Sequence, residues 1–278
     1  MHLIQAILMG IIQGLSEFLP ISSSAHLVFT SNLYKVFNNI EISYQHSGQE
    51  VFTDIMLHLG TLIAVLIYFR KDIFNIIKAL FYGIKNKEYS YDFKLGIYII
   101  LGTFISIFVA YPLSQVAEKL VFLPKIVGIL LLFTGFLLIT SEIISKKIAN
   151  KKDINLKNSI LMALAQGLAA LPGFSRSGLT IATGLLSGIE RTVAARYSFL
   201  LSIPIILGAS MVYPILELDL KEVLTYNWTA ITIGTIVSGI VGYLCIKYFM
   251  KFLSRFSLTI FGYYCIIIGI LAIIFFKG

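Results

Sequence analysis

Charged residues are scarce in this sequence. Lys, Arg, Asp and Glu make up 13% of its 278 residues, while 58% are hydrophobic; an average globular protein is about 25% charged. So few charges cannot cover the surface of a water-soluble fold, whereas lipid accepts an apolar exterior. The composition therefore predicts an integral membrane protein and excludes a soluble domain.

Cysteine is nearly absent. Cys245 and Cys265 are the only two, each inside an apolar run, with neither metal-ligand spacing nor a secretory disulfide framework. The formal net charge of +8 would suit nucleic-acid binding in a soluble protein. Here the basic residues lie between apolar runs, where they orient a membrane protein and attract anionic lipid. We therefore expect membrane lipid, and no nucleic acid, as a partner.

Six apolar runs are long enough to cross a bilayer. A hydrocarbon core about 30 Å thick takes about 20 helical residues. The predicted spans lie near residues 54–69, 94–114, 123–144, 195–213, 228–248 and 256–276. They show no polar stripes, which disfavours an anion channel with a continuous polar pore.

Two further apolar stretches are interrupted. Residues 2–36 are broken by LPISSS at 19–24, and residues 158–190 by LPGFSRSG at 171–178. Each arm has roughly 12 to 17 residues and reaches only about 18–25 Å as a helix. A signal peptide is disfavoured for the first arm because no basic segment precedes it. We expect two re-entrant hairpins whose breaks share one internal site, because irregular backbone at membrane depth must be buried in protein or line a wet cavity.

The two interrupted stretches share a pattern. Gln-Gly-Leu begins at residues 13 and 166, Leu-Pro follows at 19 and 171, and spaced serines close each break. We interpret the chain as one transmembrane domain, duplicated into halves of about 1–150 and 151–278. Each half holds one hairpin and three full spans, an odd number, so the second half enters from the opposite side. This predicts an all-α inverted repeat, as in many transporters.

The basic residues divide unequally between the two sides of this layout. Sixteen Lys and Arg residues fall on one side, and five on the other: Lys35, Lys119, Lys125, Lys221 and Lys277. Positively charged loops stay cytoplasmic. Both termini and the first hairpin are therefore expected outside, and the second hairpin is expected to enter from the cytoplasm.

Arg176 is the one basic residue that this charge count assigns to neither side of the membrane. A guanidinium at membrane depth costs at least about 2.5 kcal/mol, so it needs an anionic partner or a function. Beside it stand the hydroxyls of Ser175, Ser177 and Thr180 and the free amides of a helix start. Together these groups predict an oxyanion cradle that suits phosphate. The alternative is a structural ion pair with Glu17.

The first break carries a complementary set of groups. Ser22, Ser23 and Ser24 stand at the break, and His26 follows on the first turn of the next arm. Ser22 and Ser24 are expected to join the diphosphate-binding groups. At spacings of three and four residues, Ser23 or Ser22 can approach the imidazole, and a serine needs such a base to become a nucleophile. Attack by His26 itself, or its use as an acid, stays open, as does simple helix capping by the serines.

Glu17 and Gln13 lie one turn apart on one face of the first arm. A hard cation such as Mg²⁺ or Ca²⁺ takes one or two carboxylates together with substrate phosphate oxygens. These two residues therefore predict a divalent-cation site, although two ligands make a weak motif. His58, with Asp54 one turn before it, is interpreted as a buried polar contact at the cavity wall.

The two break motifs carry a family resemblance. QGLSEFLPISSSAH from Gln13 and PGFSRSG from Pro172 closely resemble the bacterial undecaprenyl-diphosphate phosphatases of the bacitracin-resistance type. The resemblance covers essentially the whole chain, including LHLGTLIAV from Leu57 and SFLLSIP from Ser198. It implies dephosphorylation of undecaprenyl diphosphate to the monophosphate carrier of cell-wall synthesis. It also implies a place in the plasma membrane, with the site open to the outer side.

The resemblance also implies roles for individual residues. Glu17, Ser23, His26, Ser175 and Arg176 match the active-site acid, serines, histidine and arginine of that family. Glutamine at the first position of the family's E/Q-x-x-x-E motif is an allowed variant, but it removes one carboxylate ligand.

Our preferred nucleophile is Ser23 with His26 as base, with histidine or water attack left open. The competing function is a transporter or flippase of a phosphorylated lipid or anion, which would not require the Glu17, Ser23 and His26 set. The sequence leaves the oligomeric state open, a homodimer included.

Overall fold

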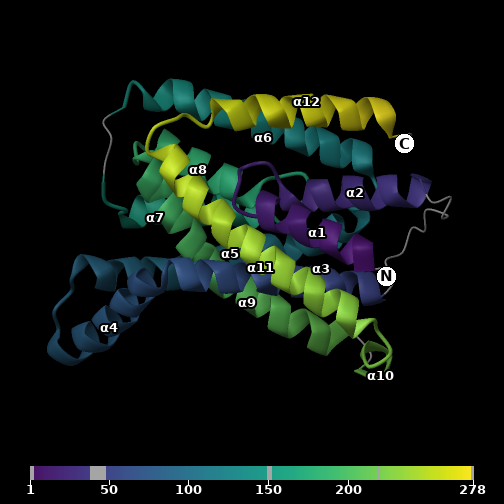
Figure 1. Ribbon diagram of the computed structural model, residues 1–278. Coiled ribbons are helices and arrows are strands. Elements are labelled where there is room, and N and C mark those ends of the chain that lie inside the picture. The colour runs from purple at the N-terminus through teal and green to yellow at the C-terminus, as the bar shows by residue number, and fades with distance from the viewer. Residues whose placement is uncertain (1–2, 38–47, 149–151, 218–219, 277–278) are drawn as a thin grey trace.

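The computed structural model describes residues 3–37, 48–148, 152–217 and 220–276 (Figure 1). All regular elements in these ranges are α-helices, as predicted, and no strand occurs in them. Lys151 and Lys277, two residues of the charge count, lie outside the described part of the chain.

The first half contains two short helices, three long ones and one amphipathic helix. They are α1 (Leu3–Ser16), α2 (Ser23–Phe37), α3 (Gly48–Tyr68), α4 (Arg70–Asn86), α5 (Tyr91–Leu120) and α6 (Pro124–Ser145). The second half contains α7 (Leu156–Leu168), α8 (Arg176–Leu186), α9 (Arg191–Glu217), α10 (Leu220–Val223), α11 (Trp228–Leu253) and α12 (Thr259–Phe275).

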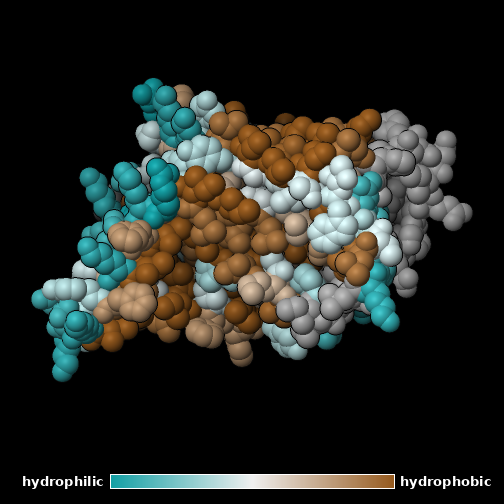
Figure 2. All heavy atoms as spheres, turned by 60° about the horizontal axis from the view of Figure 1, so that its bottom comes forward, coloured by the Kyte–Doolittle hydropathy of each residue, from teal (hydrophilic) through white to brown (hydrophobic). Residues whose placement is uncertain are grey.

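Five helices in the described ranges are both long and apolar enough to cross a membrane: α3, α5, α6, α9 and α11. They coincide with the first five predicted spans, and the protein is a multi-pass membrane protein. α12 coincides with the sixth, but its 17 residues rise only about 26 Å. Figure 2 shows a hydrophobic surface across the middle of one face, with hydrophilic side chains gathered mainly at the left end and some at the right end.

The main departure from the sequence prediction is α4, which occupies an expected loop. Five of its 17 residues carry charge, so no apolar run stands out in this segment. The helix packs along the start of α5, and the pair projects from one end of the bundle (Figure 1).

The two hairpins form as predicted, α1–α2 across one break and α7–α8 across the other. Both chain ends lie at one end of the bundle; the first hairpin enters from that end and the second from the opposite end (Figure 1). The first arm of each hairpin packs on a long helix of the other half, α1 on α11 and α7 on α5. An inverted repeat would produce this packing of each first arm on the other half, although the repeat itself stays a prediction.

Small residues permit the close approach of α1 and α11. A Cβ at Gly10 would lie 2.5 Å from the carbonyl oxygen of Gly234, and one at Gly14 would lie 2.8 Å from that of Ser238. Because a larger side chain at either glycine would push the helices apart, this packing fixes the position of the first break.

Candidate active site

The two breaks meet inside the protein. The Ser177 hydroxyl donates to the carbonyl of Leu19 at 3.0 Å, and the Gly173 amide donates to Ser24 Oγ at 3.4 Å. Gly173 has a φ of +103°, a conformation that glycine adopts without steric cost. The predicted meeting of the two breaks is therefore confirmed.

Glu17 is the centre of the cluster at this junction. Its side chain is 6% exposed, and its Oε1 accepts from Arg176 Nη2 at 2.6 Å. Its Oε2 accepts from Ser23 Oγ at 2.9 Å and from Gln13 Nε2 at 3.0 Å. The fourth neighbour is His58 Nε2, 3.6 Å from the same oxygen. A buried carboxylate needs such a cation and such donors to stay charged.

Arg176 begins α8 and has two differently placed nitrogens. One, Nη2, forms the predicted alternative, the ion pair with Glu17. The other, Nη1, is buried and has no hydrogen-bond partner among the described residues. Leaving a buried charged donor unpaired is costly. An anion bound at Nη1 would remove that cost, so the ion pair and a phosphate site are compatible.

The hydroxyls in and just after the second break are already bonded within the protein. Ser175 caps α8 by accepting from the Gly178 amide at 3.0 Å, and its Oγ lies 3.3 Å from Ser177 Oγ. Thr180 is fully buried, and its hydroxyl bonds the Arg176 carbonyl and, at 2.5 Å, Ser198 of α9. The Thr180 hydroxyl is thus engaged in packing α8 against α9, and its part in a phosphate site stays a prediction.

The predicted contact between Ser23 and His26 is not formed, although the structure describes both residues. Ser22 adopts a φ of +70° and caps α2, so the capping alternative holds for this one serine. The left-handed turn at Ser22 directs the Ser23 hydroxyl back to Glu17. Glu17, rather than the imidazole, thus lies within reach of the serine proton.

His26 faces α12 instead. Its Nδ1 donates to the Ser22 carbonyl at 2.8 Å, so Nε2 of a neutral ring accepts from the Tyr264 hydroxyl, also at 2.8 Å. The two rings are stacked, with centroids 5.6 Å apart. Tyr264 lies 238 residues further along the chain, and nothing in its local sequence signals this contact.

His58 is the site residue that the sequence analysis undervalued. Its Nδ1 donates to the Asp54 carbonyl at 2.8 Å, which leaves Nε2 facing Glu17. The side chain lines a cavity, so its predicted place at the cavity wall is confirmed, but it is 34% exposed, so the predicted burial is wrong. The sequence does show a histidine within an otherwise apolar span. It does not show that this histidine lies beside Glu17.

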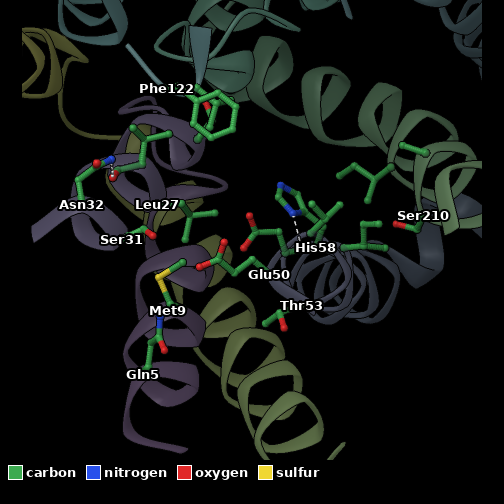
Figure 3. Close-up of a pocket in the computed structure, with 18 of the residues that line it drawn as sticks. Gln5, Met9, Leu27, Ser31, Asn32, Glu50, Thr53, His58, Phe122 and Ser210 are labelled. Carbon is green, nitrogen blue, oxygen red and sulfur yellow. Dashed lines mark hydrogen bonds between the residues drawn. The ribbon is translucent and has the colours of Figure 1, made fainter. Parts of the chain in front are cut away.

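The cavity has a volume of about 460 Å³ and is mostly apolar (Figure 3). Its wall is formed by α1, α2, α3, α9 and the segment between α5 and α6. Figure 3 shows Leu27 and His58 directed into this space from α2 and α3. Ser24 and His58 line the cavity and also contact the break residues. The cavity therefore adjoins the Glu17 cluster.

The predicted cation ligands offer one carboxylate and one amide oxygen. Gln13 Oε1 is buried and has no hydrogen-bond partner among the described residues, so it could accept a ligand. The described residues contain no group of three or more His, Cys, Asp or Glu that could hold a metal ion. A cation here would rely on Glu17, Gln13 and the oxygens of a bound phosphate.

Comparison with known proteins places this arrangement in a family. Residues 6–271 match the family model described as bacitracin resistance protein BacA. An undecaprenyl-diphosphatase of Halothermothrix orenii is 40% identical, over 99% of this chain and 98% of its own. One of Methanosphaera stadtmanae is 39% identical, over 99% and 98%, and undecaprenyl-diphosphatase 2 of Stutzerimonas stutzeri is 37% identical over the full length of both chains. With its two break motifs joined around the buried Glu17, the chain belongs to the bacitracin resistance protein BacA family.

Proposed function

We propose that this protein hydrolyses undecaprenyl diphosphate to undecaprenyl phosphate and inorganic phosphate. The reaction would recycle the lipid carrier of cell-wall synthesis and confer bacitracin resistance. The observation that carries the proposal is the contact of Ser23 and Arg176 with the buried Glu17, with one unpaired guanidinium nitrogen among the described residues, beside a mostly apolar cavity. The names of the relatives support the same substrate.

The cavity and the cluster suit the two ends of a lipid diphosphate. The apolar wall would hold the first isoprene units, and burial of their carbons is favourable by about 25 cal/mol per Å². The terminal phosphate would bind Arg176 Nη1 and the amides at the start of α8. Because Nη2 stays with Glu17, the guanidinium would hold the carboxylate and the phosphate side by side.

Ser23 is the proposed nucleophile, with Glu17 as the proton acceptor. As Ser23 Oγ bonds to the terminal phosphorus, its proton passes to Glu17 Oε2, 2.9 Å away. The bridging P–O bond breaks, and undecaprenyl phosphate leaves with the electron pair. Water then cleaves the phosphoserine: its oxygen and one hydrogen leave with phosphate, and its other hydrogen restores the serine. Arg176 stabilises the charge on the phosphoryl oxygens throughout.

His58 completes this scheme as a proton relay. Its Nε2 lies 3.6 Å from the oxygen that receives the serine proton, and its ring reaches the cavity. It can therefore take the proton from Glu17 and release it to water, which returns the carboxylate to its charged form.

A divalent cation, Mg²⁺ or Ca²⁺, belongs to the same proposal. Glu17 and Gln13 would hold it, and it would neutralise part of the diphosphate charge when bound.

The proposed location is the plasma membrane, with both termini and the mouth of the active site on the outer side. Three features support this orientation: the charge asymmetry of the loops, the position of both ends at one end of the bundle, and the cavity wall. That wall includes Gln5 near the start of α1 and Glu50 near the start of α3, both at the same end as the termini. Membrane lipid as a partner and a homodimer stay predictions.

The decisive experiment measures phosphate release from undecaprenyl diphosphate by the purified protein, with and without chelator. Release that depends on Ser23 and Arg176 supports the enzyme. A protein that releases no phosphate but moves labelled lipid between leaflets would establish the competing transporter function, which the opposed hairpins also suit.

A further inference from the structure

The amphipathic helix α4 has one face covered by protein. Ile76 and Gly83 are buried, and α5 fits closely against them: a Cβ on Gly96 would lie 2.9 Å from both Ile76 and Leu80. A Cβ on Gly83 would lie 2.3 Å from the ring of Phe93. This face fixes the rotation of α4 about its axis, and therefore determines where its other side chains point.

A second face of α4 is apolar and exposed. Phe74, Ile77, Phe81 and Ile84 follow one another at intervals of three, four and three residues, which places them on one side of a helix. Phe74, Phe81 and Ile84 are 67%, 75% and 72% exposed. At 100° per residue this stripe directly borders the face packed on α5. The apolar surface of α4 thus continues from the protein core to the outside.

The third face carries a basic stripe. Lys71, Lys78 and Lys85 recur every seven residues and are all exposed, so they lie within about 40° of one another around the helix. Each is three or four residues from Phe74 or Phe81, hence a neighbour of the apolar stripe. The acidic residue of this helix, Asp72, forms an ion pair with Arg196 and is thereby engaged away from the lysines.

An apolar stripe bordered by lysines is the pattern of a helix that lies in a membrane interface. The helix is too short and too charged to span a bilayer. Lysine stems can follow apolar surface while the ammonium groups stay at the level of the headgroups. The protein already crosses the membrane, and α4 begins directly after the span α3 ends at Tyr68. Phe74 therefore follows the end of that span by only six residues.

We propose that α4 is an interfacial helix whose Lys71, Lys78 and Lys85 bind anionic phospholipid headgroups, while Phe74, Phe81 and Ile84 insert among the acyl chains. Anionic phospholipid is the proposed ligand because the row of three positively charged lysines is complementary to the negatively charged headgroups of an anionic leaflet. The site is separate from the Glu17 cluster and independent of the proposed hydrolysis. On the charge layout it lies in the cytoplasmic leaflet.

The test uses the full-length protein in nanodiscs, with Cys245 and Cys265 replaced by alanine. An environment-sensitive fluorophore is attached at Phe81→Cys or, as the matched control on the polar side of the same helix, at Asn75→Cys. We expect lipids with brominated acyl chains to quench the probe at 81 and to leave the probe at 75 largely unquenched. Brominated phosphatidylglycerol should quench more strongly than brominated phosphatidylcholine at the same mole fraction.

The lysines are tested by K71Q/K78Q/K85Q. This variant should lose the preference for phosphatidylglycerol, whereas K146Q/K147Q/K152Q, with the same loss of charge elsewhere, should keep it. Added salt should weaken the preference in the unmodified protein, which tests the lysine site without any charge variant. Equal quenching by the two lipids, or a preference that survives K71Q/K78Q/K85Q, would overturn the anionic-lipid site. A probe at 81 that neither lipid quenches, or that cross-links to a second copy, would overturn the interfacial placement.

Discussion

Replacing Arg176 with lysine tests whether this side chain must bind Glu17 and phosphate at the same time or needs only to supply a positive charge. Nη2 donates to Glu17 at 2.6 Å. The buried Nη1 has no hydrogen-bond partner among the described residues, so it is available for phosphate. A lysine ammonium can stay with Glu17 or move to phosphate, but it cannot reproduce the planar fork. The variant therefore loses at least one charge-assisted hydrogen bond, worth about 1.5–3 kcal/mol. This corresponds to a fall in kcat/KM of about 10- to 150-fold.

The assay is phosphate release from undecaprenyl diphosphate by purified protein, normalised to folded molecules. Arg191→Lys is the matched control, because Arg191 pairs with the buried Glu142 at 2.8 and 2.6 Å, away from the two breaks. We expect this control to lower stability while leaving turnover per folded molecule unchanged. Near-normal turnover of Arg176→Lys, or an equal loss in both variants, would refute the assignment of Arg176 to phosphate.

The other predictions concern the nucleophile, the relay, the cation and the orientation. Ser23→Ala should abolish phosphate release and His26→Ala should retain more turnover, because the serine faces the buried carboxylate and the imidazole faces α12; the reverse order would favour attack by the histidine. His58→Gln should lower kcat by about 100-fold with little change in KM, and an unchanged kcat would contradict the relay. Chelator should stop phosphate release and added Mg²⁺ or Ca²⁺ should restore it; turnover that resists chelator argues against the cation. In a cysteine-free background, Asn150→Cys should be shielded from an impermeant thiol reagent outside intact cells and Leu220→Cys should be labelled, and the opposite pattern would reverse the topology.

The sequence by itself was sufficient for the membrane class, the long helices and the two breaks. These properties depend on the local density of apolar residues, because lipid excludes charge from any segment of sufficient length. Glu17 and Arg176 were identifiable for the same reason, since an ionisable group amid apolar sequence needs a partner or a function wherever the chain folds. The ion pair between Glu17 and Arg176 was predicted only as the alternative to phosphate binding. The structure makes the ion pair and a phosphate site compatible.

Only the tertiary structure decided which groups touch within the site. A left-handed turn at Ser22 sends Ser23 to Glu17, whereas helical spacing alone pointed to His26. His58 and Tyr264 join the site from α3 and α12. The covered, the exposed apolar and the basic faces of α4 became distinct only once α5 was packed against it. Side-chain contacts of this kind depend on how helices distant in sequence pack together, and a local pattern of residue types does not encode that packing.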